Sequence, residues 1–295
     1  TLFPYTTLFR SAERLIRLAK NMMGALPGGL AHVNIVAAML FGAIAGSSVA
    51  AASAIGSILG PKMEEEGYSR EFSAAVNITS STTGLLIPPS NVLIIYSLAS
   101  GGVSIAALFI AGYLPGLLTG LMLMVVASIW AKRKNFPVGE RAAFTELVSS
   151  FLEAIPVLLL LIIVIGGIVA GIFTATEASA IAVLYCLVLG FVYKELQWSH
   201  LPEIFIDSAR TTSIVLLLIA TSIGMSWVMS FEQIPQNVTS FLLSLSDNPV
   251  IILLLINLVL LFVGTFMDMT PAVLIFTPIF LPIVTDFGID PIHFG

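Results

Sequence analysis

Three short polar interruptions in long apolar stretches hold the residues best suited to bind a solute or an ion. The first is Gly46-Ser47-Ser48, where small residues let the chain turn and hydroxyls offer oxygen ligands. The second is Ile87-Pro88-Pro89-Ser90-Asn91, and the third is Asp268-Met269-Thr270-Pro271. Backbone leaves helical geometry at membrane depth only where protein or a water-filled cavity satisfies its polar groups. Each break is therefore a candidate binding site.

The paired prolines of the second break indicate which ligands such sites would take. They remove backbone donors, and Pro89 is suited to start a new half-helix with Ser90 and Asn91 in its first turn. Freed carbonyls suit a hard cation such as sodium, and the new helix dipole suits an anionic group. We expect Na⁺ as a coupling ion and no permanently bound cofactor. The predicted ion ligands are Gly46, Ser48, Pro88, Ser90 and Asn91, and the predicted solute-binding residues are Ser47, Ser48, Asp268 and Thr270.

Structural interpretations of these residues stay open. Hydroxyls in membrane helices often bond only to their own helix, and a single proline is commonly a kink. Asp268 is the only acid of its apolar segment, and it either faces a cavity or reaches the interface, where water solvates it. Asn34 and Asn257 either join helices or ligate ions. Glu177 is expected to stabilise a helix amino terminus, and His32 is expected at the membrane interface.

The composition places the chain in a bilayer. It is 58% hydrophobic and 10% charged, with a mean hydropathy of +1.04, which a water-solvated domain of this length could hardly keep soluble. The net charge of −5 comes from scattered acids and indicates no nucleic-acid partner. The single cysteine, Cys186, excludes a disulfide framework and a cysteine metal site within one chain.

Hydropathy predicts an all-α, multi-pass membrane protein. Apolar segments predict five crossings, at residues 74–98 (the proline-broken span), 105–130, 155–173, 178–193 and 211–231, the last four being the connecting spans of 105–231. Residues 27–61 and 250–284 are too long for one span and are interrupted midway. We expect each of these two regions to form a re-entrant helical hairpin.

Basic residues predict the orientation. Beyond Lys20, every Lys and Arg lies in one of three loops, which the positive-inside rule assigns to the cytoplasm: Lys62 and Arg70; Lys132, Arg133, Lys134 and Arg141; Lys194 and Arg210. The loops alternate sides without conflict if both long regions return to the side from which they entered.

The two predicted hairpins also resemble each other. Gly42 aligns with Gly264 and Ala50 with Ala272, and after a slip of one residue Pro61 and Gly67 align with Pro282 and Gly288. Because an odd number of crossings separates them, the hairpins enter from opposite faces. Inverted repeats with broken helices are typical of secondary transporters that expose one midplane site alternately to the two sides.

The amino terminus requires its own interpretation. Residues 1–11 (TLFPYTTLFRS) fit neither a signal peptide nor a spanning helix, and they resemble a translated sequencing adapter. We expect residues 1–11 to be non-native and residues 12–295 to be a carboxy-terminal transporter fragment. A native interfacial arm is the alternative.

The motifs resemble those of a known family. The run FGAIAGSSVAAASAIG with Pro61, Gly67-Tyr68, the IPPS stretch and the late segment 264–295 is similar to the large (permease) subunit, DctM-like, of tripartite ATP-independent periplasmic (TRAP) transporters. The resemblance covers nearly everything after Ser11. It implies an elevator-type, sodium-coupled importer in the bacterial inner membrane. It also implies a small membrane subunit and a periplasmic substrate-binding protein as partners, and a carboxylate-bearing solute.

Two departures from the family pattern accompany the resemblance. The early spans of the family are absent, and the second proline-broken span is not reached by Gly295. One of the two sodium sites that the resemblance implies is therefore expected to be incomplete.

Other function classes receive less support from the sequence. A divalent-anion/sodium symporter that works without a binding protein is the alternative within transport. An intramembrane enzyme would need paired catalytic acids, a zinc motif or a nucleophile with a base, and the sequence contains none of these. A scaffold does not explain matching helix breaks. We therefore expect a transporter subunit and not an enzyme.

Overall fold

The computed structural model describes residues 3–134, 136, 138–139, 141–194, 196–246 and 248–295, with side chains from Ala12 onward except that of residue 243. Within these residues the chain is built from helices without a β-strand, and Pro27 and Val138 form one isolated β-bridge. The predicted all-α membrane fold is confirmed. The chain divides into two compact units, residues 1–91 with 109–197 and residues 92–108 with 198–295, which are described separately below.

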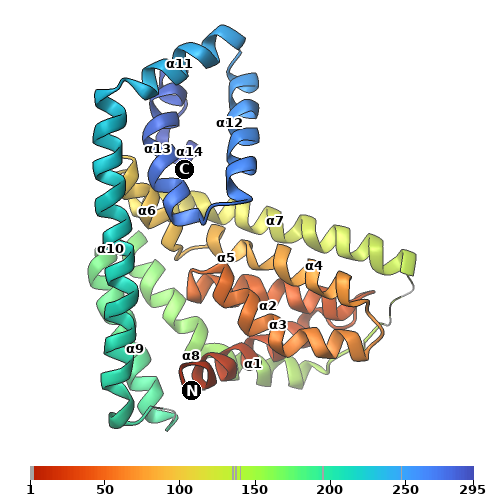
Figure 1. Cartoon of the computed structure of the whole chain (residues 1–295). Helices are drawn as coiled ribbons and strands as arrows, with labels where there is room; N and C mark the ends of the chain where they lie inside the picture. Colours follow the sequence, from red (N-terminus) through yellow and green to blue (C-terminus); the bar gives the residue numbers. More distant parts are fainter. Residues whose placement is uncertain (1–2, 135, 137, 140, 195, 247) are drawn as a thin grey trace. The chain divides into compact units, whose positions relative to one another are not determined.

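The first unit contains the first predicted hairpin and the spans around it (Figure 1). The helices α2, α3 and α4 pack against one another, and α1 packs against α2 and α8. Its helices are α1 (Phe3–Met23), α2 (Gly29–Ala45), α3 (Ser48–Glu65), α4 (Arg70–Ser81), α5 (Thr83–Leu86), most of α7 (Ile105–Lys134), α8 (Phe144–Val169) and α9 (Ala175–Val192).

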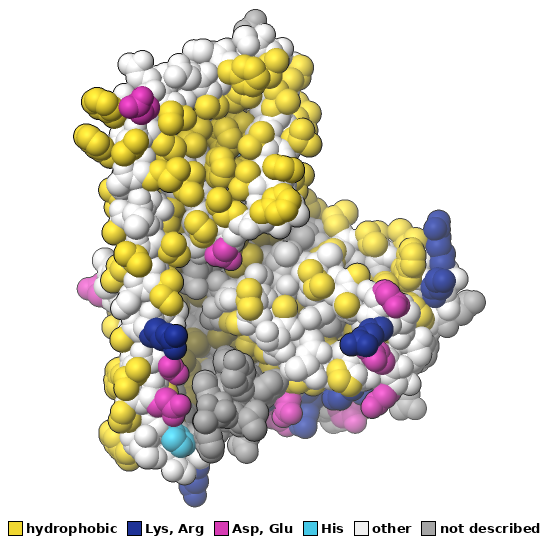
Figure 2. Space-filling model, in the orientation of Figure 1, with side chains coloured by type: hydrophobic (Ala, Val, Ile, Leu, Met, Phe, Trp, Pro, Cys, Tyr) yellow, Lys and Arg dark blue, Asp and Glu magenta, His cyan; other side chains and the backbone are white. Residues whose placement is uncertain are grey.

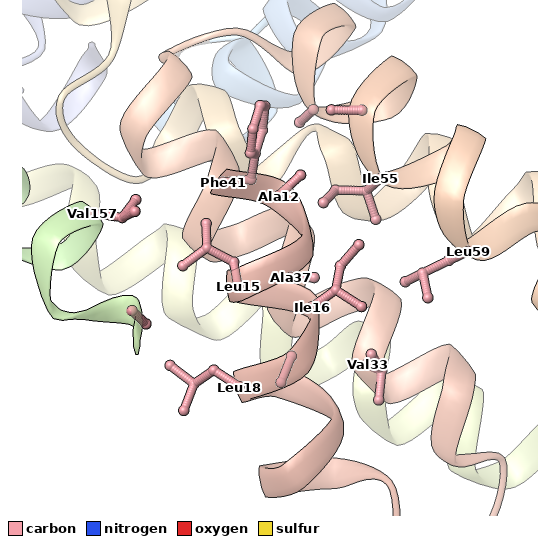
Figure 3. Packing of buried hydrophobic residues seen from close by; sticks show 14 residues of the cluster. Ala12, Leu15, Ile16, Leu18, Val33, Ala37, Phe41, Ile55, Leu59 and Val157 are labelled. Carbon is pink, nitrogen blue, oxygen red and sulfur yellow. The ribbon is translucent and has the colours of Figure 1, made fainter. Parts of the chain in front are cut away.

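Apolar packing holds this unit together. A buried cluster joins Leu15 of α1, Phe41 of α2, Ile55 of α3 and Val157 of α8, and Figure 3 shows the side chains converging. Where α2 meets α5, Gly42 and Gly84 approach so closely that a Cβ on Gly42 would lie 2.3 Å from the Gly84 Cα. Only glycine permits this crossing of α2 and α5.

The second unit contains the second predicted hairpin. Helices α10, α11 and α12 all contact α13, around a core that includes Ile252, Ile256 and Ile283. Figure 2 shows hydrophobic side chains covering much of the visible face of α10, α12 and α13, as expected of helices in lipid. The helices are α6 (Asn91–Ala99, from Val92 on), α10 (Leu201–Phe231), α11 (Ile234–Leu245), α12 (Pro249–Gly264), α13 (Met269–Asp286) and α14 (Pro291–Phe294), with a 3₁₀ turn at Trp198–His200.

Among the described residues, length and composition identify five helices able to cross a membrane, or six if α4–α5 and α6 form one broken span. Four of them, α7, α8, α9 and α10, overlap the predicted connecting spans, although α8 and α10 begin earlier than predicted. The fifth is α13, which the sequence assigns to a hairpin, whereas α2 and α12 are shorter apolar helices. The re-entrant course of both hairpins stays a prediction.

The hairpins share one local design. Both α3 and α13 are 18 residues long, contain a proline and begin after a residue whose side chain caps the helix. The pairs Ser47 and Asp268, Pro61 and Pro282, Gly67 and Gly288, and Ser69 and Asp290 occur at one constant separation along the chain, one residue shorter than that of Gly42 and Gly264. Both Gly67 and Gly288 have left-handed φ values, 88° and 76°. The internal repeat seen in sequence is thus a repeat of capping and turn geometry.

At the amino terminus, α1 runs without interruption from Phe3 to Met23. The foreign origin expected for residues 1–11 stays a prediction, and residues 1 and 2 lie outside the described residues.

Candidate functional site

The tip of the first hairpin is a tight turn between two helices. Gly46 ends α2 in the left-handed region, with φ 58° and ψ 22°, which glycine adopts without strain. Ser47 is extended, and its Oγ accepts a hydrogen bond from the Ala50 N–H at 3.3 Å. Ser47 is therefore an amino-terminal cap of α3, and this structural role uses one lone pair of its hydroxyl. Ser48 is the first residue of α3.

The proline break also lies where the sequence predicts it. Helix α5 ends at Leu86, α6 begins at Asn91, and the Pro88–Pro89 peptide bond is cis. The hydroxyl of Ser90 is fully buried and donates to the Leu85 carbonyl oxygen. The Ser90 proton is therefore used in the bond to Leu85 near the end of α5, and the lone pairs of the hydroxyl remain available to a cation.

The first unit brings the turn and the break together. A Cβ on Gly46 would lie 3.0 Å from the Pro89 carbonyl oxygen, 3.4 Å from the Asn91 backbone N and 3.6 Å from the Asn91 Cγ. A backbone carbonyl and a side-chain amide therefore lie close to the hairpin tip, and the lack of a Cβ at Gly46 allows this close approach. Sequence reasoning named Pro88 but missed the carbonyl of Pro89, although Ser90 and Asn91, which follow it, were expected to start a new helix.

The hydroxyl groups of α4 and α5 mostly bond to nearby backbone carbonyls, which is the structural interpretation given above. Thr79 and Ser81 donate to carbonyls of their own helix, α4. Thr82 and Thr83 donate to the carbonyls of Thr79 and Ser80 at the end of α4. These hydroxyls satisfy local backbone and donate no hydrogen bond to the turn at Gly46.

The tip of the second hairpin has the same local form with an acid in place of serine. Asp268 is exposed and caps α13, its Oδ2 accepting from the Thr270 N–H at 3.3 Å. It borders a cavity of about 790 Å³ within the second unit, whose other polar lining includes Asn257, Thr277 and His293. Capping explains part of the role of Asp268, and its participation in solute binding stays a prediction.

Three further residues test the sequence interpretation. Asn34 is completely buried, and its Oδ1 accepts from Ser80 Oγ at 2.9 Å, so it joins α2 to α4. Glu177 forms a capping box with Thr174, which confirms its helix-stabilising role. The interfacial depth expected for His32 stays a prediction. Its side chain is 1% exposed, and its Nε2 lies 3.1 Å from Ser128 Oγ of α7, so it contacts protein at this position.

Among the described residues, no three His, Cys, Asp or Glu side chains gather to hold a metal ion. The oxygen atoms at the first hairpin tip are instead uncharged carbonyl, amide and hydroxyl groups. Such a set can dehydrate a monovalent cation that is bound only transiently.

Comparison with known proteins identifies the family. A profile described as "Tripartite ATP-independent periplasmic transporter, DctM component" matches residues 7–295. The chain belongs to the DctM family. This is a family of membrane transporter subunits and not of enzymes, and the expected TRAP permease resemblance is confirmed.

Individual relatives agree with this assignment. "Uncharacterized protein YgiK" of Salmonella typhimurium is 58% identical over 96% of this chain and 65% of its own length. "C4-dicarboxylate TRAP transporter large permease protein DctM" of Pseudomonas aeruginosa is 42% identical over 96% and 66%. "Isethionate TRAP transporter permease protein DctMQ" of Oleidesulfovibrio alaskensis is 41% identical over 96% and 45%. The chain therefore spans about two thirds, or less, of the length of these relatives.

Proposed function

We propose that the protein carrying this chain imports a small organic anion together with sodium, receiving the anion from a periplasmic binding protein. The observation that carries this proposal is the apposition of the Gly46–Ser48 turn with the Pro89–Asn91 break in the first unit. Two interrupted helices that meet at membrane depth expose backbone polar groups, and such groups need a ligand, protein or water there.

Sodium suits the chemistry of this apposition. The Pro89 carbonyl, the Asn91 amide oxygen and the hydroxyls of Ser48 and Ser90 are hard, neutral oxygen ligands. The amino terminus of α3 begins at the same turn, and its dipole favours an anionic group nearby. A cation and an anion bound side by side would stabilise each other, which is the physical basis of coupled transport.

The names of the relatives indicate the solute class. C4-dicarboxylates are carboxylates and isethionate is a sulfonate, so both named solutes are small organic anions. We propose a carboxylate as the solute, a small membrane subunit as partner and the bacterial inner membrane as the location. The positive-inside rule predicts that the basic loops lie in the cytoplasm, which agrees with a multi-pass protein of that membrane.

The test is uptake by the full-length protein, with its small subunit and binding protein, in proteoliposomes. Uptake should require an inward sodium gradient. The variants Ser48→Ala and Ser90→Ala should each raise the sodium concentration for half-maximal uptake by about fivefold, because one oxygen ligand contributes about 1 kcal/mol. Ser57→Ala is the matched control, since the Ser57 hydroxyl donates only to the Ala54 carbonyl of its own helix.

Three results would contradict the proposal. Uptake that persists unchanged without sodium would show that transport is not coupled to sodium. Wild-type sodium dependence in both serine variants would show that the ion site lies elsewhere. Uptake that needs no binding protein would favour the divalent-anion symporter.

A further inference from the structure

A polar seam joins α2, α3 and α4, and its α2 member, Asn34, lies about three helical turns before the tip at Gly46. Asn34 Oδ1 on α2 accepts from Ser80 Oγ on α4 at 2.9 Å. Asn77 Nδ2 on α4 donates to the Ala52 carbonyl oxygen on α3 at 2.9 Å. Both Asn34 and Ser80 are 0% exposed.

Each amide in this seam has one buried atom without a hydrogen-bond partner in the protein: Asn34 Nδ2, which is a donor, and Asn77 Oδ1, which is an acceptor. Turning the Asn77 amide over would place its oxygen against the Ala52 oxygen, so its orientation is fixed by the Ala52 bond. A buried polar atom without a partner costs about as much as a lost hydrogen bond.

The two atoms belong to one small region. Asn77 and Ser80 are three residues apart on α4 and therefore share a face, and Asn34 bonds directly to Ser80. On the α3 side, the Asn77 amide packs directly against Gly56, where a Cβ would lie 2.3 Å from Asn77 Nδ2. The two atoms thus belong to residues that lie where α2, α3 and α4 pack against one another.

We infer that one buried water molecule binds in this seam, accepting from Asn34 Nδ2 and donating to Asn77 Oδ1. Water is the ligand class that fits, because it accepts and donates at once, and a buried water needs two to four polar partners. A cation would be repelled by the Asn34 N–H, so the free donor disfavours it.

The bound water would complete a set of contacts that fix α2 and α3 on α4. Helices α2 and α3 flank Gly46, and α4 leads through α5 into the Pro89–Asn91 break, which lies against Gly46. The seam therefore positions the turn against the break. This role is independent of which solute or ion the protein transports.

The direct test is a high-resolution structure of the full-length protein in lipid nanodiscs. We expect one density peak about 2.7–3.2 Å from both Asn34 Nδ2 and Asn77 Oδ1, unchanged when sodium is replaced by choline. Direct contact between the two amides, with no peak, would overturn the inference. A peak at about 2.4 Å from oxygens alone that disappears without sodium would also overturn it, in favour of a cation.

A mutant cycle measured by thermal unfolding gives an independent test. Asn34→Leu and Asn77→Leu each leave the water with one partner fewer, and each should lower Tm by about 2–5 °C. The double variant should lose clearly less than the sum, because both changes remove the same water. Additive losses would overturn the inference. Thr79→Val is the control, since the exposed Thr79 hydroxyl bonds only to its own helix, and its Tm should stay within about 1 °C.

Discussion

The two hairpins share one local pattern but differ in how far the described residues of this chain bury them. In the first, twelve residues of α2 are buried, among them His32, Asn34 and Gly42. In the second, only Ile252 and Ile256 of α12 are buried, and Asn257 borders an open cavity. Both hairpins nevertheless cap and terminate their second helix at matching residues.

This difference separates features that nearby residues determine from features that depend on packing between helices. Caps and left-handed glycines act within a few residues, so they recur wherever the sequence motif recurs. Burial and hydrogen bonding across helices depend on which other helices are adjacent. The repeat therefore predicts local geometry in both hairpins and packing in neither, and five experiments can break or sharpen this comparison.

The largest expected effect is all-or-none and concerns the side of the membrane on which each loop lies. Single cysteines replacing Arg141 and Gln236, in a Cys186→Ala background, should react with an impermeant maleimide from opposite sides, Arg141→Cys from the cytoplasm and Gln236→Cys from the periplasm. Labelling of inside-out and right-side-out vesicles measures this. Reaction of both from one side would end the description of the hairpins as inverted.

The next effect concerns matched glycines. Gly42→Ala should lower the free energy of unfolding by about 1–3 kcal/mol, because the new Cβ would lie 2.3 Å from the Gly84 Cα. Gly264→Ala is the control at the aligned position, where a Cβ meets nothing within 4 Å. Thermal unfolding of both variants checks this, and equal losses would show that the α2–α5 crossing is not the constraint.

The charge at the second tip should matter for transport more than for stability. Asn caps a helix about as well as Asp, so Asp268→Asn should change the free energy of unfolding by less than about 0.5 kcal/mol. Uptake in proteoliposomes should fall about tenfold, since an exposed acid beside the cavity would lose its charge. Unchanged uptake would mean that Asp268 acts only as a cap.

The cap at the first tip should have a smaller effect on stability. Ser47→Ala removes the acceptor for the Ala50 N–H and should cost about 1 kcal/mol. Ser53→Ala, at an exposed position of the same helix, should cost less than about 0.5 kcal/mol. Chemical denaturation monitored by circular dichroism can compare them, and indistinguishable midpoints would contradict the capping role.

The smallest effect at neutral pH concerns Tyr68, whose aligned residue in the second hairpin is Ile289. Burial raises the pKa of Tyr68, which lies in the loop between α3 and α4, to about 12. Because the unfolded chain has a tyrosine pKa of about 10, the folded protein holds the proton more tightly, and stability is lost as pH rises from about 10 towards 12. Wild type and Tyr68→Phe should therefore have similar Tm at pH 7, while wild type loses more above pH 10. Parallel curves up to pH 12 would show that Tyr68 is solvated.

Sequence reasoning located the three helix breaks because glycine, proline and capping residues signal them directly. It located α7 to α10 because spans of this length need long apolar runs. It could not find the Pro89 carbonyl opposite Gly46, since a backbone atom carries no residue-specific signal. It also could not find the contact between His32 and Ser128, because polarity alone does not reveal a partner ninety-six residues away.

The sequence by itself determined the membrane class, the helices, their breaks and caps, and the family, because each follows from composition or from residues close together along the chain. Only the tertiary structure decided that the Gly46 turn meets Pro89 and Asn91, that Asn34 joins Ser80, and that Gly42 crosses Gly84. These contacts connect residues far apart in the chain. They depend on how apolar faces pack, and many different sequences can satisfy that packing.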